Sequence, residues 1–307
     1  MMENQRVAVI GAGLMGHGIA LCLARAGHAV IVHDPVAASL DALGDRIAES
    51  MALIGESEQI SAVLARIEAT DSLDKAVADA TFVTEAAPEN LVLKQEIFAR
   101  LERAAPRDAI LASNTSVLPI TAITAQMTTG DRAVGTHWWN PPHLIPLVEV
   151  IRTKATSEAT ISTTMSLLAD AGKSPVRVEK DVPGFIGNRL QHALWREAIS
   201  LVEHGICDAA AVDTVIKASF GRRLAVLGPL ENADLIGLDL TRAIHENVLA
   251  DLEASPAPSP YLTDLIAQGR LGMKAGSGFY EWTEQDADAA RQRVARHLVQ
   301  LNRTMPR

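Results

Sequence analysis

The sequence predicts an α/β Rossmann domain, with a doubly wound and mostly parallel sheet, followed by an all-α domain. Three observations support this prediction. Short runs of strand-forming residues alternate with helical patterns through the first 180 residues, and the first run breaks into GAGLMG at residues 11–16. Beyond residue 182 the hydrophobic period is helical. We therefore place the two domains at residues 1–181 and 182–307.

The glycine-rich turn follows an apolar strand at residues 7–10 and opens a helix that runs to residue 26. Its glycines have separate tasks: Gly11 permits the tight turn, Gly13 lets the backbone approach a pyrophosphate, and Gly16 lets the helix pack closely. The helix directs free N–H groups at the phosphates. The expected cofactor contacts of this loop also include Leu14 and Met15.

The second strand, at residues 29–33, ends in Asp34. A carboxylate at this point can accept hydrogen bonds from both hydroxyls of an adenosine ribose. It repels a 2′-phosphate, and residues 35–37 offer no arginine to hold one. The sequence therefore favours NAD over NADP.

Further elements follow in order. Strands are predicted at residues 67–69, 81–84, 109–113, 133–135, 147–151 and 174–178. Helices of the first domain are predicted as a pair within 36–66 divided near Gly55, then at 73–78, 90–101 and 157–171. After a hinge at 181–184, helices are predicted at 185–205, 209–219, 235–252 and 261–268, and from Thr283 onward.

The composition excludes several classes of function. The 307 residues include 28 basic and 37 acidic side chains, with a net charge of −9, and show no basic stripe for nucleic acid. No stretch approaches the length of a membrane span, and MMENQR is no signal region. Cys22 and Cys207 are expected to be reduced thiols of a cytoplasmic protein, and we expect no metal site.

Polar residues follow two of the buried strands. Glu85, Glu89 and Lys94 come after strand 81–84, and the sequence SNTS ends strand 109–113 with Asn114 and Ser116. Because the carboxyl ends of strands face the ligand crevice of a doubly wound sheet, we expect these residues near the cofactor. The alternative for the two glutamates is simple stabilisation of a helix N-terminus.

Glu149 interrupts the apolar strand 147–151, where a carboxylate is costly unless it is paired. The proline-bearing loop before it reverses the chain, so an antiparallel return would bring Glu149 beside His137. Such a pair fixes the imidazole tautomer and raises its basicity. The alternative for His137 is an ordinary loop histidine without a chemical role.

At these motifs the chain resembles the 3-hydroxyacyl-CoA dehydrogenase family, from residue 6 to about residue 282. The resemblance rests on GAGLMGHGIA, APENLVLKQEIF, SNTS, THWWNPPHLIPLVEV, DVPGFIGNRL and KAGSGFYEW. It implies a catalytic pair, His137 and Glu149, with Ser116 and Asn188 at the reacting oxygen. It also implies cofactor contacts by Asp34, Glu89, Lys94 and Asn114, and a homodimer formed through the helical domain.

Within this family, the segments APEN, NPPHLIPLVEV, SPVRV and GRRLAVLGPLE are most similar to the L-gulonate 3-dehydrogenase (lambda-crystallin) and, in part, carnitine dehydrogenase branch. That resemblance implies that Arg223, or its neighbour Arg222, binds a substrate carboxylate. Residues 36–79 carry nine acidic and three basic side chains, which disfavours the polyphosphate of coenzyme A. We therefore expect an enzyme that oxidises the 3-hydroxy group of a small L-3-hydroxy acid. The alternatives are an L-3-hydroxyacyl-CoA dehydrogenase and a non-catalytic crystallin-like or nucleotide-sensing protein.

Overall fold

The computed structural model describes residues 4–305 and divides into two compact units. One comprises the chain up to Arg189 together with the segment from Arg293, and the other is Leu190–Gln292. The division falls inside a helix because the residues at its start are hydrogen-bonded to the sheet unit. The predicted domain boundary at 181/182 stays a prediction.

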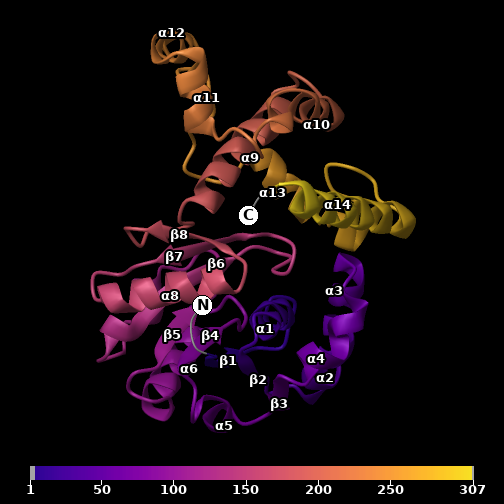
Figure 1. Ribbon diagram of the computed structural model, residues 1–307. Helices are drawn as coiled ribbons and strands as arrows, with labels where there is room; N and C mark the ends of the chain where they lie inside the picture. The colour runs from indigo at the N-terminus through magenta and orange to yellow at the C-terminus, as the bar shows by residue number, and fades with distance from the viewer. Residues whose placement is uncertain (1–3, 306–307) are drawn as a thin grey trace. The chain divides into compact units, whose positions relative to one another are not determined.

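The first unit is built on an eight-stranded sheet of order β3-β2-β1-β4-β5-β6-β7-β8 (Figure 1). Every neighbouring pair is parallel except β6 with β7, so the predicted doubly wound, mostly parallel sheet is confirmed. The strands are β1 (Arg6–Ile10), β2 (Ala29–His33), β3 (Ile67–Thr70), β4 (Phe82–Glu85), β5 (Ile110–Ser113), β6 (Ala133–Trp138), β7 (Leu147–Ile151) and β8 (Ser174–Val178).

Helices connect these strands. They are α1 (Gly16–Arg25), α2 (Ala37–Asp41), α3 (Leu43–Ile54), α4 (Ile60–Leu64), α5 (Leu73–Val77), α6 (Leu91–Ala104), α7 (Ile120–Ile123) and α8 (Glu158–Asp170). Gly55 ends α3 in a left-handed conformation, which places the break between the predicted helix pair where its glycine indicated. The short helix α7 was not predicted, since one turn is too short to show a helical period.

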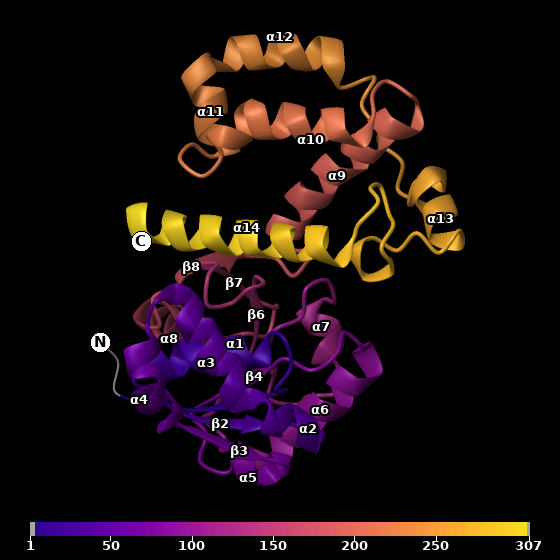
Figure 2. The ribbon, with the colours of Figure 1, turned by 90° about the vertical axis from the view of Figure 1, so that its right-hand side faces the viewer.

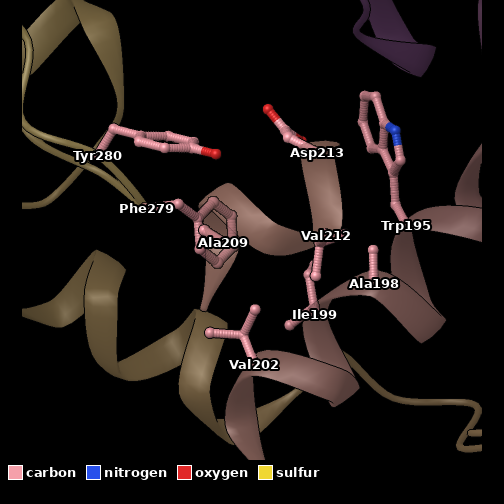
Figure 3. Close-up of a pocket in the computed structure, with 9 residues that line it drawn as sticks. All are labelled: Trp195, Ala198, Ile199, Val202, Ala209, Val212, Asp213, Phe279 and Tyr280. Carbon is pink, nitrogen blue, oxygen red and sulfur yellow. The ribbon is translucent and has the colours of Figure 1, made fainter. Parts of the chain in front are cut away.

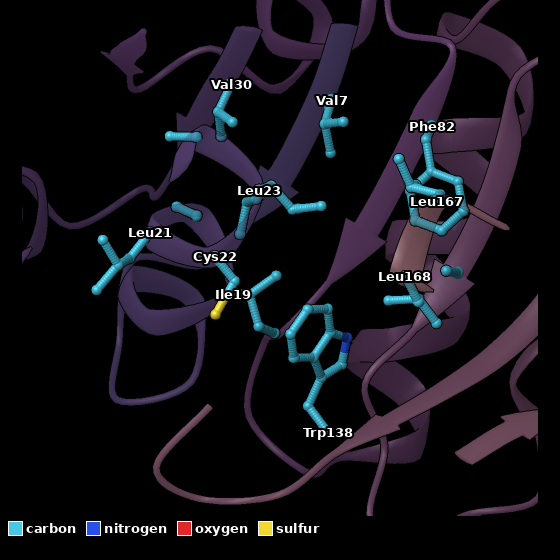
Figure 4. Close-up of a cluster of buried hydrophobic side chains, with 14 of the residues drawn as sticks. Val7, Ile19, Leu21, Cys22, Leu23, Val30, Phe82, Trp138, Leu167 and Leu168 are labelled. Atoms are coloured by element: carbon cyan, nitrogen blue, oxygen red, sulfur yellow. The ribbon is translucent and has the colours of Figure 1, made fainter. Parts of the chain in front are cut away.

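Two buried clusters cover the two faces of the sheet. In β1, Val7 and Val9 belong to one cluster, while Ala8 and Ile10 belong to the other. Side chains alternate across a strand, so both faces of this strand are buried and its sequence is continuously apolar. The first cluster packs α1 and α8 against the sheet and includes Trp138, the large ring at the centre of Figure 4.

The second unit contains helices and two isolated bridges, which pair Ser277 with Gly272 and with Glu281. Its helices, drawn in Figure 2, are α9 (Gly187–Glu203), α10 (Ala209–Ala218), α11 (Pro229–Ile236), α12 (Leu238–Val248) and α13 (Pro260–Ala267). The last helix, α14 (Glu284–Thr304), begins in this unit, and its residues from Arg293 belong to the first unit. The single helix predicted at 235–252 is wrong. Gly237, at φ +98°, divides α11 from α12, a conformation that a helix cannot contain.

Candidate active site

The glycine-rich turn after β1 is shaped by close backbone contacts. A Cβ on Gly11, which has φ +114°, would lie 2.7 Å from the carbonyl oxygen of Ala86. A Cβ on Gly16 would lie 1.7 Å from the carbonyl oxygen of Gly11. At Gly13, by contrast, nothing lies within 4 Å of the added atom. The chain therefore needs two of these glycines for its own packing and leaves open space at the third.

That open space belongs to a cavity of about 840 Å³ at the carboxyl ends of β1 and β2. Asp34 lines it and accepts hydrogen bonds from the N–H groups of Ala12 (2.8 Å) and Val36 (2.9 Å). The predicted loop residues also line it: Gly11, Gly13, Leu14 and Met15. Arg100 of α6 is a further lining residue, paired with Asp74 at 2.9 Å. Reasoning from residues near Asp34 in sequence missed it, because α6 is distant in the chain.

Lys94 is fully buried and does not line this cavity. Its Nζ lies 2.7 Å from Oε1 of Glu85, which is also fully buried, and 3.4 Å from Oε2 of Glu89. The second oxygen of Glu85 accepts a hydrogen bond from the Ser113 hydroxyl at 2.6 Å. The structure thus places Lys94 behind the carboxyl ends of β4 and β5, where it joins two glutamates.

Glu89 holds the SNTS segment through a single oxygen. Oε1 accepts hydrogen bonds from the Thr115 hydroxyl (2.6 Å) and from the N–H groups of Ser116 (2.9 Å) and Val117 (3.1 Å). Burial by itself would raise the pKa of Glu89, but these hydrogen bonds and the charge of Lys94 hold that pKa below its usual range. Glu89 is therefore kept as a carboxylate beside Ser116.

His137 and Glu149 face each other across the antiparallel pair β6–β7. The imidazole Nδ1 lies 2.7 Å from Oε2 of Glu149, and the two residues are 3% and 1% exposed. Because a carboxylate can only accept, Nδ1 carries the proton and Nε2 is left as the basic nitrogen. The predicted proximity is confirmed, but the strand predicted at 133–135 is shorter than the observed one. β6 continues through Trp138, so His137 lies on a strand and not in a loop.

The other oxygen of Glu149 is also satisfied. Oε1 accepts hydrogen bonds from the N–H groups of Ile186 (2.8 Å) and Gly187 (3.0 Å) at the start of α9. Burial alone would raise the pKa of Glu149, but the hydrogen bonds from His137, Gly187 and Ile186 outweigh it and lower the pKa. Glu149 therefore stays ionised and can balance a positive charge on His137.

Ser116 and Asn188 are brought together, as the motifs suggested. The Asn188 side-chain Nδ2 donates a hydrogen bond to the backbone oxygen of Ser116 at 2.8 Å. Asn114 is buried, and its Oδ1 accepts from the N–H of Trp138 at 2.9 Å. The SNTS segment is thereby tied to both β6 and the first turn of α9.

Two aromatic rings flank the imidazole of His137, and neither contact is predicted from the sequence. The ring centroid of Trp139 lies 5.2 Å from that of His137, and the ring centroid of Phe185 lies 5.6 Å from it. Phe185 has φ +51°, a left-handed conformation that costs about 1–2 kcal/mol for a residue with a Cβ.

His143, whose ring centroid lies 6.4 Å from that of His17, is partly buried, and neither ring nitrogen has a hydrogen-bond partner among the described residues. Burial, with the charges of Lys173 and Arg25 and neighbouring His17, lowers its pKa to about 4. His143 is therefore neutral near pH 7.

Arg222 and Arg223 belong to the second unit, in and directly after a single helical turn that follows α10. Both are exposed, and no ion pair with either occurs within residues 4–305. In the same part of the chain, no cluster of three or more histidine, cysteine, aspartate or glutamate side chains could hold a metal ion. No helix there is long and apolar enough to cross a membrane.

Comparisons with known proteins define the class. Residues 6–182 match the NAD-binding domain of 3-hydroxyacyl-CoA dehydrogenase, and residues 184–282 match the C-terminal domain of the same family. The chain belongs to the 3-hydroxyacyl-CoA dehydrogenase family. It is an NAD-dependent oxidoreductase, as the sequence predicted, and the open space at Gly13 and the carboxylate of Asp34 suit that cofactor.

Individual relatives differ in their named substrates. The chain is 35% identical to 5-formyl-3-hydroxy-2-methylpyridine 4-carboxylate 5-dehydrogenase of Mesorhizobium japonicum over 99% of both chains. A crystal structure described as that type of enzyme, "an NAD+ dependent dismutase", has a TM-score of 0.91 and 34% identity, over 98% of each chain. L-carnitine dehydrogenase of Streptomyces griseus is 40% identical over 88% of each, and a probable 3-hydroxybutyryl-CoA dehydrogenase of Bacillus subtilis is 38% identical over 92% of this chain and 99% of its own.

Proposed function

We propose that this enzyme reversibly oxidises the 3-hydroxy group of a small, free L-3-hydroxy acid to the 3-oxo acid. The observation that carries the proposal is the buried pair of His137 and Glu149, joined at 2.7 Å. In the neutral imidazole, this arrangement puts the proton on Nδ1 and leaves Nε2 of His137 able to accept one. A neutral imidazole with a fixed tautomer is the usual general base near neutral pH.

In the proposed mechanism, Nε2 of His137 removes the hydroxyl proton of the substrate. Bound NAD⁺ supplies the hydride acceptor. Glu149 stabilises the imidazolium that forms, through a charge-assisted hydrogen bond in a buried environment. Ser116 and Asn188 hydrogen-bond to the reacting oxygen and orient it toward His137. The reverse reaction returns the proton from the imidazolium to that oxygen.

The cofactor would be held by two groups of residues. Gly11, Gly13, Leu14, Met15 and Gly16 form the phosphate loop, and Asp34 would bind the adenosine ribose. Glu89, Lys94 and Asn114 occupy the ends of β4 and β5. Since Lys94 is fully buried, we assign it a supporting place behind Glu89.

Two features support a free acid as substrate. Arginine has a planar fork that matches a carboxylate, and Arg223 forms no ion pair with any of residues 4–305. Two relatives are named for a pyridine carboxylate and for carnitine, and both of these compounds carry a carboxylate. The acidic side chains of residues 36–79 are a weaker argument against coenzyme A. Two positively charged side chains, Arg296 and Arg303 of α14, lie beside this segment, where they line a cavity with Leu53 of α3.

The second candidate is an L-3-hydroxyacyl-CoA, such as 3-hydroxybutyryl-CoA. It is favoured by the match along residues 6–282 to the domains of 3-hydroxyacyl-CoA dehydrogenase, and by the relative from Bacillus subtilis. A panel that pairs each 3-hydroxy acid with its coenzyme A thioester separates the candidates.

On that panel, Arg223→Met is expected to lower kcat/KM for the free acid by about ten- to a hundredfold, the loss expected for one hydrogen bond to a charged group. NADH affinity should stay unchanged. Arg222→Met is the matched control and should retain activity. If Arg222→Met shows the loss and Arg223→Met does not, the carboxylate contact belongs to Arg222. Efficient turnover of 3-hydroxybutyryl-CoA by the wild type, unaffected by Arg223→Met, would contradict the free-acid proposal.

We further propose a cytoplasmic homodimer. Both cysteines are free, as in reducing compartments. None of the helices α9 to α12 contains a buried residue in a single copy of the chain. Leu230, Val226 and Leu235 are 81%, 79% and 72% exposed. This unit also holds a mostly apolar cavity of about 320 Å³, whose lining side chains are drawn in Figure 3. Exposed apolar surface of this extent is typical of an interface.

Light scattering at micromolar concentration is expected to give the mass of two chains. Leu235→Asp should shift that mass toward one chain, because a buried carboxylate at the interface would be unpaired. Val92→Asp, on an exposed position of α6, is the control and should leave the mass unchanged. A wild-type protein with the mass of one chain would refute the dimer.

A further inference from the structure

The imidazole of His137 is enclosed by rings from two separate segments. Trp139 follows directly after β6, and its indole is tilted by 46° to the imidazole. Phe185 comes from the turn before α9, and its ring is tilted by 51°. His137 is only 3% exposed. The orientation of its ring therefore depends on these two neighbours as well as on Glu149.

The backbone at Phe185 indicates that its ring is required at this position. Gly184, at φ +75°, already completes the turn after Pro183, with the N–H of Phe185 bonded to the oxygen of Val182 at 3.1 Å. The left-handed conformation then continues into Phe185, a non-glycine residue at φ +51°. Such strain persists where surrounding structure enforces it, and it gathers at functional sites. The side chain is 1% exposed and packs with Ile120, Ile151 and Val178.

The indole of Trp139 contacts both the imidazole of His137 and the backbone of Gly187. Its indole N–H is buried and has no acceptor among the described residues. A Cβ on Gly187 would lie 2.4 Å from Cζ2 of the indole, so the ring rests directly on the glycine. The N–H of that same glycine donates to Glu149 at 3.0 Å. Trp139 thus contacts the imidazole of His137 and also the backbone of Gly187, whose N–H holds the carboxylate of Glu149.

We propose that Trp139 and Phe185 are positioning residues that clamp the imidazole of His137. They prevent the ring from rotating about its Cβ–Cγ bond, which would put Cδ2 in the place of Nδ1 and break the hydrogen bond to Glu149. They also keep water away from that bond. This inference rests on the proposed role of His137 as the base, and neither ring touches the reacting atoms in it.

The test compares leucine, which keeps apolar volume, with substitutions that keep a ring. Trp139→Leu and Phe185→Leu are expected to lower kcat by about ten- to a hundredfold, the size of effect caused by misplacing a catalytic group. KM and NADH affinity should change little. Trp139→Phe should retain most of the activity, because the indole N–H that it removes has no acceptor within residues 4–305.

A second readout is independent of turnover. The proton between Nδ1 of His137 and Glu149 is expected to give a downfield resonance in proton NMR spectra, identified by its loss in His137→Gln. That resonance should persist in Trp139→Phe and broaden or vanish in Trp139→Leu. If Trp139→Leu keeps the resonance and kcat, and only the unfolding midpoint falls, the rings fill space and the clamp is refuted. Should Phe185→Leu fail to fold, the two Trp139 variants decide the question. Retained turnover in His137→Gln would overturn the proposed base, while the resonance would still report whether the rings position the imidazole.

Discussion

Replacing His137 with alanine is expected to lower kcat by about 10²–10⁴-fold, the usual contribution of a general base. NADH binding should remain nearly intact, because His137 lies on β6, whereas the predicted nucleotide contacts follow β1, β2, β4 and β5. Steady-state kinetics with the best acid of the panel would measure the first quantity, and fluorescence titration with NADH the second.

His143→Gln is the matched control. It changes a histidine six positions further along the same segment, whose nitrogens have no partner among residues 4–305. It should retain most of the wild-type kcat. Turnover that survives His137→Ala, or falls equally in both variants, would remove His137 from the role of base.

Replacing Lys94 with methionine is expected to lower the free energy of unfolding by about 3–5 kcal/mol, since removing one member of a buried pair leaves the other charge uncompensated. Glu85 is fully buried and would keep only its bonds from the Ser113 hydroxyl (2.6 Å) and the Ala87 N–H (2.6 Å). Urea unfolding followed by circular dichroism gives the measurement.

Lys75→Met serves as its control. Lys75 and Glu68 lie 2.6 Å apart, as close as the buried pair, but both side chains are more than half exposed. Water screens such a pair, so its loss should change stability far less. The double variant Glu85→Gln with Lys94→Met should recover part of the loss. Equal stability of Lys94→Met and the wild type would show that Lys94 is not structurally required.

The pair of His137 and Glu149 illustrates what a local sequence pattern could predict. An acid inside an apolar strand must find a partner, and a proline-bearing loop after His137 implied an antiparallel return. Those two local features were enough to predict that Glu149 lies beside His137, and the register of β6 and β7 confirms it. The resemblance of the motifs added the roles of both residues, which remain proposals.

Long-range contacts were beyond such reasoning. The sequence predicts that Lys94 contacts the cofactor, because it follows a strand near the crevice. In the structure, its side chain is fully buried and paired with Glu85 and Glu89. Its direction depends on the packing of α6, which no local spacing records. The return of α14 to the first unit is similar, since Asn302 bonds to the oxygen of Leu144 at 2.7 Å across 158 residues.

The sequence alone determined the alternation of strands and helices, the phosphate-loop glycines and the partner of His137, because each depends on hydrophobic period, backbone freedom or neighbouring strands. Only the tertiary structure decided how those parts are supported. The placement of Phe185 and Trp139 around the imidazole joins two segments more than forty residues apart. Ring contacts of this kind arise from side-chain packing in three dimensions, and they leave no periodic signal along the chain.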